Sequence, residues 1–285
     1  MKICIVSVFK NENHILKEWL DHYINEGVDT FLLTDNGSTD DYISTLQPYI
    51  QSGHVILKIN PKKHAQTELL NVYLKDAKKF DWVIIVDLDE FIYARKGFTT
   101  IKEYLQTLPD DVHKIYIPWK MFGSSGLKTQ PTSVIQNFIH RREYPNKLCH
   151  TCYDVLADKK SIIRGKQLKE IKIHNSIIHT KSYTITPDNL DINNKDYYQE
   201  VTESQLKNSF LHLNHYRIQS WEWFKKNKIN RTDAANKKNV RDKKYFNFFD
   251  YKDMIDTELK NKKYKKNKTK KHKTKKNKTV KIKFF

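Results

Sequence analysis

The sequence DWVIIVDLDEF, residues 81–91, joins an apolar run directly to a group of acids. Its first part, residues 81–86, predicts a buried β-strand because it is short, apolar and rich in β-branched residues. Asp87, Asp89 and Glu90 follow at the carboxyl end of that strand. Two carboxylates one residue apart are costly to desolvate there unless a positive charge lies beside them. A divalent cation meets that need and can neutralise a diphosphate, so we expect Asp87 and Asp89 to bind a metal. The alternative is an acidic turn exposed to water.

The chain before this stretch alternates between predicted strands and predicted helices. Apolar runs predict strands at residues 2–8, 29–34 and 54–59. Helical spacing of apolar residues predicts helices at residues 13–26, near 41–50 and near 65–79. This alternation predicts an α/β fold with a mostly parallel, Rossmann-like sheet and helices on both faces. In such sheets, ligands bind beyond the carboxyl ends of the strands.

Two further polar clusters follow predicted strands. Lys10, Asn11 and Glu12 come after the first strand, and the sequence DNGSTD, residues 35–40, comes after the second. Asp35 can accept a hydrogen bond from a base or a ribose, but the same residues also suit a capped turn before a helix. Three clusters at one edge of a sheet favour a binding site over three unrelated turns.

The strong positive charge of the chain is concentrated near its end. The formal net charge is +19, and 14 of the 52 basic residues lie between residues 260 and 283. The rest of the chain carries 38 basic and 33 acidic residues. A lysine-rich segment binds phosphates without sequence preference, and we expect this one to contact anionic membranes or polyanions. Because the remainder is only mildly basic, a nucleic-acid-binding protein is an alternative rather than the leading interpretation.

Several segments together resemble glycosyltransferases of the family 2 and family 92 type. They are, in order, KNENHILKEWLDHYINEGVDTFLLTDNGSTDD (residues 10–41), HAQTELLN (64–71), WVIIVDLDEF (82–91), WKMFGSSG (119–126) and LNHYRIQSWEWFKKNK (213–228). The pair of acidic motifs is widespread among enzymes with the GT-A fold. Its combination with FGSSG and NHYR is more specific, and the resemblance runs from residue 2 to about 230.

The resemblance implies a GT-A (nucleotide-diphospho-sugar transferase) fold and a metal-dependent glycosyltransferase, with a hexosyltransferase expected. It implies a nucleotide-sugar donor, with a UDP-sugar favoured, and Mn²⁺ or Mg²⁺. The residues carried over to the donor are Asn11, Glu12, Asp35, Asn36, His64 and Gln66. Those carried over to the metal are Asp87 and Asp89, with His179 and His215 as candidates for a third ligand beside the nearby His174. Trp119 and residues 122–126 are expected on the acceptor side, where the acceptor is a glycan, a protein or a lipid.

The general base is the least defined part of the predicted site. Inversion, which we expect, requires a carboxylate to take the proton of the acceptor hydroxyl. Glu143, Asp154 and Glu170 are candidates, and nothing in the sequence selects one of them. A second enzymatic interpretation is nucleotidyl transfer onto a sugar phosphate, although a glycine-rich loop after the first strand would then be expected in place of residues 10–12.

We expect one catalytic domain at residues 1–258, followed by a disordered lysine-rich tail at residues 259–285. The domain divides into a nucleotide-sugar-binding half (1–110), an acceptor-side half (111–230) and a C-terminal helical segment (231–258). In the second half, strands are predicted at 114–119, 134–140, 153–157 and 171–179, a mobile loop at 123–126, and a helix at 219–230. Three cysteines and the lack of a signal or membrane-spanning segment predict a soluble, cytoplasmic protein.

Overall fold

A computed structural model describes residues 1–145, 159–179, 183–189, 201–229, 241–264 and 283–284. Asp154, the predicted strand at 153–157 and most of the lysine-rich tail therefore lie outside the described residues. No helix in these ranges combines the length and the apolar character needed to cross a membrane.

The first half of the chain forms the predicted parallel sheet. Its elements are β1 (Ile3–Phe9), α1 (Asn13–Asn25), β2 (Thr30–Asp35), α2 (Tyr42–Gln51), β3 (Val55–Ile59), α3 (Gln66–Asn71), α4 (Leu74–Ala77) and β4 (Trp82–Ile85). The strands lie in the order β3-β2-β1-β4, and all three pairings are parallel. The single helix predicted at 65–79 is two short helices. Between them, Tyr73 turns inward, and its hydroxyl donates to the carbonyls of Leu33 and Ile56.

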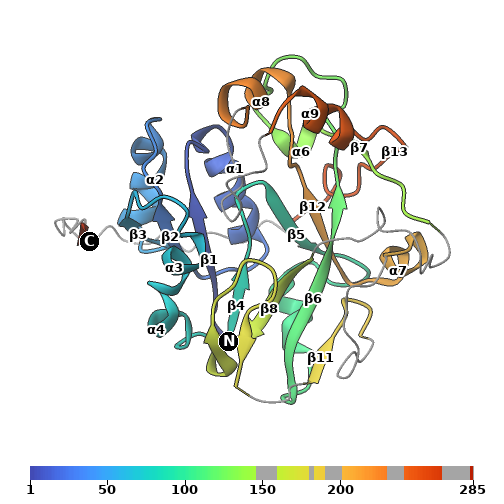
Figure 1. Ribbon diagram of the computed structural model, residues 1–285. Helices are drawn as coiled ribbons and strands as arrows, with labels where there is room; N and C mark the ends of the chain where they lie inside the picture. The colour runs from blue at the N-terminus through green and yellow to red at the C-terminus, as the bar shows by residue number, and fades with distance from the viewer. Residues whose placement is uncertain (146–158, 180–182, 190–200, 230–240, 265–282, 285) are drawn as a thin grey trace.

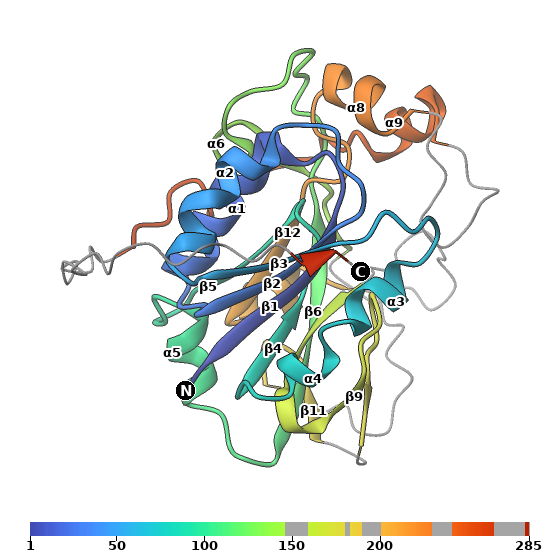
Figure 2. The same ribbon diagram turned by 90° about the vertical axis from the view of Figure 1, so that its left-hand side faces the viewer.

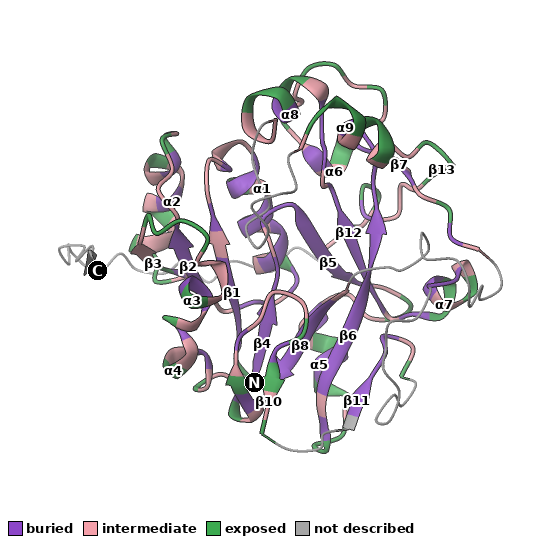
Figure 3. Ribbon diagram, in the orientation of Figure 1, coloured by how far each residue is buried: buried purple, intermediate pink, exposed green. Residues whose placement is uncertain are grey.

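Helices cover both faces of this sheet, as Figure 2 shows for α1 and α2 on one side and α3 and α4 on the other. The side chains of β1 point alternately to the two faces of the sheet, as successive side chains of any strand do. They therefore contribute to a core on each face. Ile3 and Ile5 pack in the core beneath α1. Cys4 and Val6 pack in a second core with residues of α3 and α4. The central strands are buried along their length (Figure 3).

The second half of the chain extends the sheet and makes it mixed. Its larger elements are β5 (Glu90–Ala94), α5 (Ile101–Gln106), β6 (Val112–Met121), β8 (Lys159–Arg164), β11 (Tyr183–Ile185), α7 (Glu203–Asn208), β12 (Leu211–His215), α8 (Trp221–Asn227) and α9 (Lys243–Phe249). Its smaller elements are α6 (Val134–Asn137), β7 (His140–Arg141), β9 (Leu168–Glu170), β10 (Ile177–Ile178), β13 (Met254–Ile255) and β14 (Lys283–Phe284).

The order of strands is β14-β3-β2-β1-β4-β8-β6-β12-β5, with β8 antiparallel between β4 and β6 (Figure 1). The strand predicted at 134–140 was wrong, because Ser133 caps a short helix there. The predicted strand at 171–179 shrinks to the two residues of β10. Asp87, Asp89 and Glu90 follow β4, the strand at which the parallel half of the sheet meets the mixed half.

The chain remains packed beyond the domain end predicted at residue 258. Leu259 is buried in the main core. Lys262 lies 3.2 Å from the carboxylate of Glu26, which is fully buried. The hydroxyl of Tyr264 donates to the same carboxylate. The predicted boundary therefore cuts through packed chain, and the packed segment runs at least to Tyr264.

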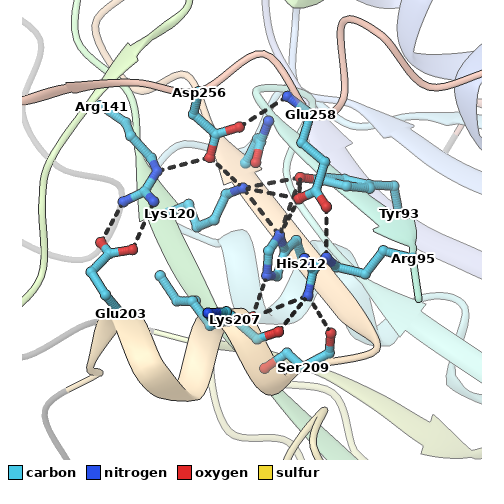
Figure 4. A network of polar contacts seen from close by, with 12 residues as sticks. Tyr93, Arg95, Lys120, Arg141, Glu203, Lys207, Ser209, His212, Asp256 and Glu258 are labelled. Carbon is cyan, nitrogen blue, oxygen red and sulfur yellow. Dashed lines mark hydrogen bonds and ion pairs between the residues drawn. The ribbon is translucent and has the colours of Figure 1, made fainter. Parts of the chain in front are cut away.

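A buried network of charged and polar side chains fixes this C-terminal segment to the sheet (Figure 4). Lys120 of β6 contacts Asp256 at 2.7 Å and lies near Glu258 at 3.8 Å. Arg141 contacts Asp256 at 2.8 Å and Glu203 at 2.7 Å. Tyr93, Arg95 and His212 complete what we call the Lys120 network, since each contacts Glu258.

Candidate functional site

The backbone of the acidic stretch is held in place by α1. The indole Nε1 of Trp19 donates to the carbonyls of Asp87 and Glu90 at 3.2 and 3.1 Å. The hydroxyl of Tyr23 donates to the carbonyl of Glu90 as well. Both aromatic side chains are fully buried. The turn between β4 and β5 is therefore fixed by side chains of the predicted 13–26 helix.

Strand pairing brings a histidine to these acids. β12 runs antiparallel to β5, and its register places His215 opposite Glu90. One possible ligand atom from each of Asp89, Glu90 and His215 lies within 4.8 Å of the others. All three side chains are buried. Within the described part of the chain, Oε1 of Glu90 and Nδ1 of His215 have no hydrogen-bond partner.

These three residues fit a divalent cation. Carboxylate oxygens and a neutral imidazole are common ligands of such ions. Burial lowers the pKa of His215, which favours the neutral imidazole. Burial also raises the pKa of Glu90, because the charge of Lys160 offsets the lost hydration only in part and Asp87 and Asp89 add repulsion. A cation beside Glu90 would supply further positive charge.

Asp87 is held differently from Asp89. Lys160 of β8 is fully buried and contacts Asp87 at 2.6 Å and Glu90 at 3.4 Å. Burial alone would lower the pKa of Lys160, but the two carboxylates raise it above its usual value. The amide of Gln66 also donates to Asp87. Asp87 thus already has a positive partner, whereas the grouping with His215 involves Asp89 and Glu90.

A second lysine, Lys228 at the end of α8, also approaches the acids. Its Nζ is 3.5 Å from Oδ2 of Asp89 and 3.9 Å from Oε1 of Glu12. Burial alone would raise the pKa of Asp89, but Lys228, His215 and Lys160 together outweigh it, and the pKa falls below its usual value. Asp89 is therefore ionised at neutral pH. This contact also places Glu12, predicted on the donor side, at the same site.

A pocket of about 520 Å³ lies next to the acids, at the start of α3. It is lined by Lys62, His64, Ala65, Gln66, Thr67, Glu68, Asn71, Glu170 and Ile173. Gln66 connects the pocket to the acids through its bond to Asp87. His64 has a positive φ of 54°, and such backbone outliers cluster at functional sites. The predicted donor residues His64 and Gln66 thus line one pocket with Glu170.

The other predicted donor residues mainly bond to the protein itself. Asp35 accepts from the backbone N–H of Ser38 and from the hydroxyl of Tyr42. Asn36 donates to the carbonyls of residues 60 and 62. Asn11, with a φ of 56°, accepts from the backbone N–H of Thr39. These bonds connect the loops after β1, β2 and β3, so the three loops form one connected rim.

The residues expected on the acceptor side lie close to His215. Trp119 packs against His215, with ring centroids 4.2 Å apart. The predicted mobile loop at 123–126 is instead fixed. The backbone N–H of Gly123 donates to the carbonyl of His140, and that of Ser124 donates to Asp250. A Cβ on Gly123 would overlap the carbonyl of Tyr251, so close backbone approach requires glycine there.

Several candidates are not brought to the acidic group. His179 is exposed, follows β10 and bonds through its backbone to Gln167, so it is not part of the grouping that contains His215. His174 lies against Trp119, with centroids 5.4 Å apart. Among the candidate bases, Glu143 is exposed and its backbone bonds to Asp253. Asp154 lies outside the described residues.

Two lysines of the site were missed from the sequence. Lys160 lies in a strand that the periodicity did not predict. Lys228 lies in the quoted stretch WEWFKKNK, where three lysines look equivalent. Helical spacing distinguishes them only in part. Lys225 and Lys226 are exposed, whereas the side chain of Lys228 is 12% exposed.

Acids, a histidine and lysines lie beside a pocket at the strand ends of a mixed α/β sheet. This arrangement is the one expected of the GT-A class. The sequence profile described as Glycosyltransferase family 92 matches residues 1–284. The chain therefore belongs to glycosyltransferase family 92. This confirms the predicted resemblance.

Individual relatives agree with this assignment. A family 92 glycosyltransferase protein of Ricinus communis is 24% identical over 85% of this chain and 41% of its own length. One of Oryza sativa subsp. japonica is 22% identical over 78% of this chain and 34% of its own length. The chain thus spans about two fifths or less of these relatives.

Solved structures give only distant likeness. Staphylococcus aureus TarS in complex with UDP aligns with 58% of this chain and 47% of its own, at 19% identity and a TM-score of 0.38. Glucosyl-3-phosphoglycerate synthase from Mycobacterium tuberculosis, in complex with Mn²⁺ and UDP, aligns with 42% of this chain and 44% of its own. Its identity is 20% and its TM-score is 0.28.

Proposed function

We propose that this chain transfers a sugar from a nucleotide-diphosphate sugar to a hydroxyl group of an acceptor. The observation that carries the proposal is the balance of charge at the edge of the sheet. Three acids, Asp87, Asp89 and Glu90, lie there beside two lysines, Lys160 and Lys228. An excess of acid beside a neutral histidine suits a divalent cation.

We infer that Asp89, Glu90 and His215 would hold Mn²⁺ or Mg²⁺. When bound, such an ion supplies charge neutralisation for a diphosphate leaving group. The chain's own residues do the rest. Lys160 pairs with Asp87 and offsets the repulsion between this carboxylate and Glu90. Gln66 orients the same carboxylate toward the pocket.

The donor is proposed to bind along the rim formed by the loops after β1, β2 and β3. Asn11, His64 and Gln66 lie on this rim, and the pocket volume of about 520 Å³ is within the usual range for small-ligand sites. Asp35 and Asn36 support the rim through their bonds to it. Their expected contacts with the nucleoside remain part of the proposal, with a UDP-sugar as the favoured donor.

Glu170 is the candidate base that the geometry favours. It is the one candidate among the described residues that lines the pocket, and Gln66 on the same wall reaches Asp87. A carboxylate there could take the proton of an acceptor hydroxyl during inversion. Trp119, packed against His215 with the two rings tilted, is proposed to shape the acceptor side.

A donor-hydrolysis screen with UDP- and GDP-sugars, with and without Mn²⁺, tests the function. We expect metal-dependent release of one nucleoside diphosphate. Thermal shift gives a second measure, because a ligand that binds the folded state raises the melting temperature. UDP or GDP should stabilise the protein only with Mn²⁺. Stabilisation by oligonucleotides alone, lost at high salt, would instead support a polyanion-binding protein.

A further inference from the structure

We propose that Lys228 and the divalent cation are alternative partners of Asp89, and that the donor's diphosphate draws the ammonium group away from this carboxylate. Lys228 would thus hold Asp89 in the unliganded protein and bind the diphosphate in the liganded one. This inference rests on the proposed function. It goes beyond it by assigning one residue two successive partners.

The first observation is the length of the Lys228 contacts. Charge-assisted N–H···O hydrogen bonds are usually 2.7–2.9 Å long, and Lys160 meets Asp87 at 2.6 Å. Lys228 lies farther out, at 3.5 Å from Asp89 and 3.9 Å from Glu12. It is attracted by both carboxylates and tightly bonded to neither. Such a group can be withdrawn at little cost.

The second observation is that Lys228 also contacts an aromatic ring, in addition to the two carboxylates. Its ammonium lies 4.9 Å from the centroid of the Trp223 ring, a cation–π distance. Trp223 is buried in a separate small core with Ile218, Phe224 and Phe246. Ser220 caps α8 by accepting from the backbone N–H of Trp223, and its hydroxyl donates to Gln130. The helix that carries Lys228 is therefore held in place, and the lysine side chain extends from it toward the acids.

The third observation is that Asp89 contacts Lys228 and is also a member of the possible cation site. Its carboxylate is shared between Lys228 and the possible cation site with Glu90 and His215. An ammonium and a divalent cation at one buried carboxylate repel each other. A diphosphate resolves this repulsion, because its oxygens can contact both positive groups. Metal and Lys228 should therefore oppose each other without nucleotide and cooperate with it.

This reasoning predicts effects of opposite sign for Lys228→Met. Without nucleotide, the affinity for Mn²⁺ should rise by about threefold or more, since a competing charge is gone. With saturating Mn²⁺, the affinity for UDP should fall by about tenfold, since a charge-assisted contact is worth roughly that much. A merely structural role for Lys228 would lower both affinities or change neither.

The test uses the full chain and two direct binding measurements. Free Mn²⁺ is followed by its electron paramagnetic resonance signal, and UDP or GDP binding by calorimetry at saturating Mn²⁺. Lys226→Met is the matched control, because Lys226 is exposed on the same helix. Lys228→Arg keeps the charge and should restore nucleotide binding. If Lys228→Met does not fold, Lys228→Gln replaces it.

The outcomes separate this inference from the proposed function. If the wild type binds Mn²⁺ but neither nucleotide, the proposed function fails, while the Mn²⁺ comparison still decides whether Lys228 competes at Asp89. Tighter Mn²⁺ binding with weaker nucleotide binding supports the inference. Unchanged or weaker Mn²⁺ binding in Lys228→Met, or no Mn²⁺ binding by the wild type, overturns it.

Discussion

Two groups of buried polar and charged side chains share the strands β5 and β12, and they differ in how completely they are paired. In the Lys120 network, the short contacts of Lys120, Arg141 and Arg95 with carboxylates are 2.7–2.8 Å long. At the acidic edge, Lys228 stays 3.5 Å or more from its acids. Buried atoms of Glu90 and His215 have no hydrogen-bond partner among the described residues.

Strand geometry keeps the two groups apart. Glu90 and His215 face each other in the register of β5 and β12, and so do Tyr93 and His212. Positions three residues apart on a strand point to opposite faces. The completely paired side therefore holds the C-terminal segment, and the incompletely paired side is left available to a ligand. Both sides are charged and buried, and the completeness of pairing is what distinguishes them.

The largest expected effect is on catalysis. Asp89→Asn should lower turnover by about 10³-fold, roughly 4 kcal/mol of transition-state stabilisation, because the carboxylate can no longer hold the cation. The melting temperature should stay close to that of the wild type. Donor hydrolysis and Mn²⁺-dependent UDP binding measure the loss, with Asp110→Asn in an exposed turn as control. Normal turnover in Asp89→Asn would remove the functional half of the comparison.

The next effect should be on stability alone. Lys120→Met leaves Asp256 buried with one cationic partner fewer, and breaking such a pair costs about 3–5 kcal/mol of unfolding free energy. Urea denaturation measures this cost. The double variant Lys120→Met/Asp256→Leu should recover part of it, because no unpaired charge remains. A cost below about 1 kcal/mol for the single variant would show that the network is not structural.

Truncation separates the packed C-terminal segment from the lysine-rich residues that follow. A chain ending at Glu258 loses buried Leu259 and leaves Glu26 without Lys262 and Tyr264. We expect it to be less stable by about 3 kcal/mol. A chain ending at Tyr264 should lose much less, since β14 adds only two residues to the sheet edge. Equal melting temperatures for both truncations would contradict this.

The smallest effect concerns pH. Burial alone would raise the pKa of Asp256, but Lys120 and Arg141 lower it to about 2, from an ordinary value of 3.8. A depressed carboxyl pKa stabilises the fold above pH 3.8, and this stability is lost as the pH falls toward 2. We expect a loss of about 2 kcal/mol across this window. In Asp256→Asn, unfolding free energies between pH 2 and 5 should show a correspondingly shallower slope.

The sequence predicted the parallel half of the fold because its signals are local. Short apolar runs followed by polar turns identified β1, β2, β3 and β4, and the same runs located Asp87 and Asp89 at a strand end. The mixed half depends on partners far apart in the chain. β8 lies between β4 and β6, which precede it by many residues, and no local pattern states that pairing.

The difference between local signals and contacts of distant residues also explains which residues of the candidate site the sequence did not predict. Glu90 was seen as part of an acidic run, but its grouping with His215 follows from the register of β12. Lys160 and Lys228 come from elements whose positions only the folded chain defines. FGSSG suggested mobility from its composition, whereas backbone bonds to His140 and Asp250 fix it. The composition of a loop does not show the hydrogen bonds that residues far away in the sequence will make with it.

The contact between Tyr264 and Glu26 has a consequence for how the chain folds during synthesis. The two residues are 238 positions apart, and at about 5–20 residues per second the ribosome needs on the order of 10–50 s to make the chain between them. Throughout that interval, the end of α1 carries a carboxylate whose burial depends on residues not yet translated. The N-terminal units can form early, but the closing step must wait. We therefore expect the rate of this last folding step to respond to changes near Tyr264 more than to changes at the acidic edge.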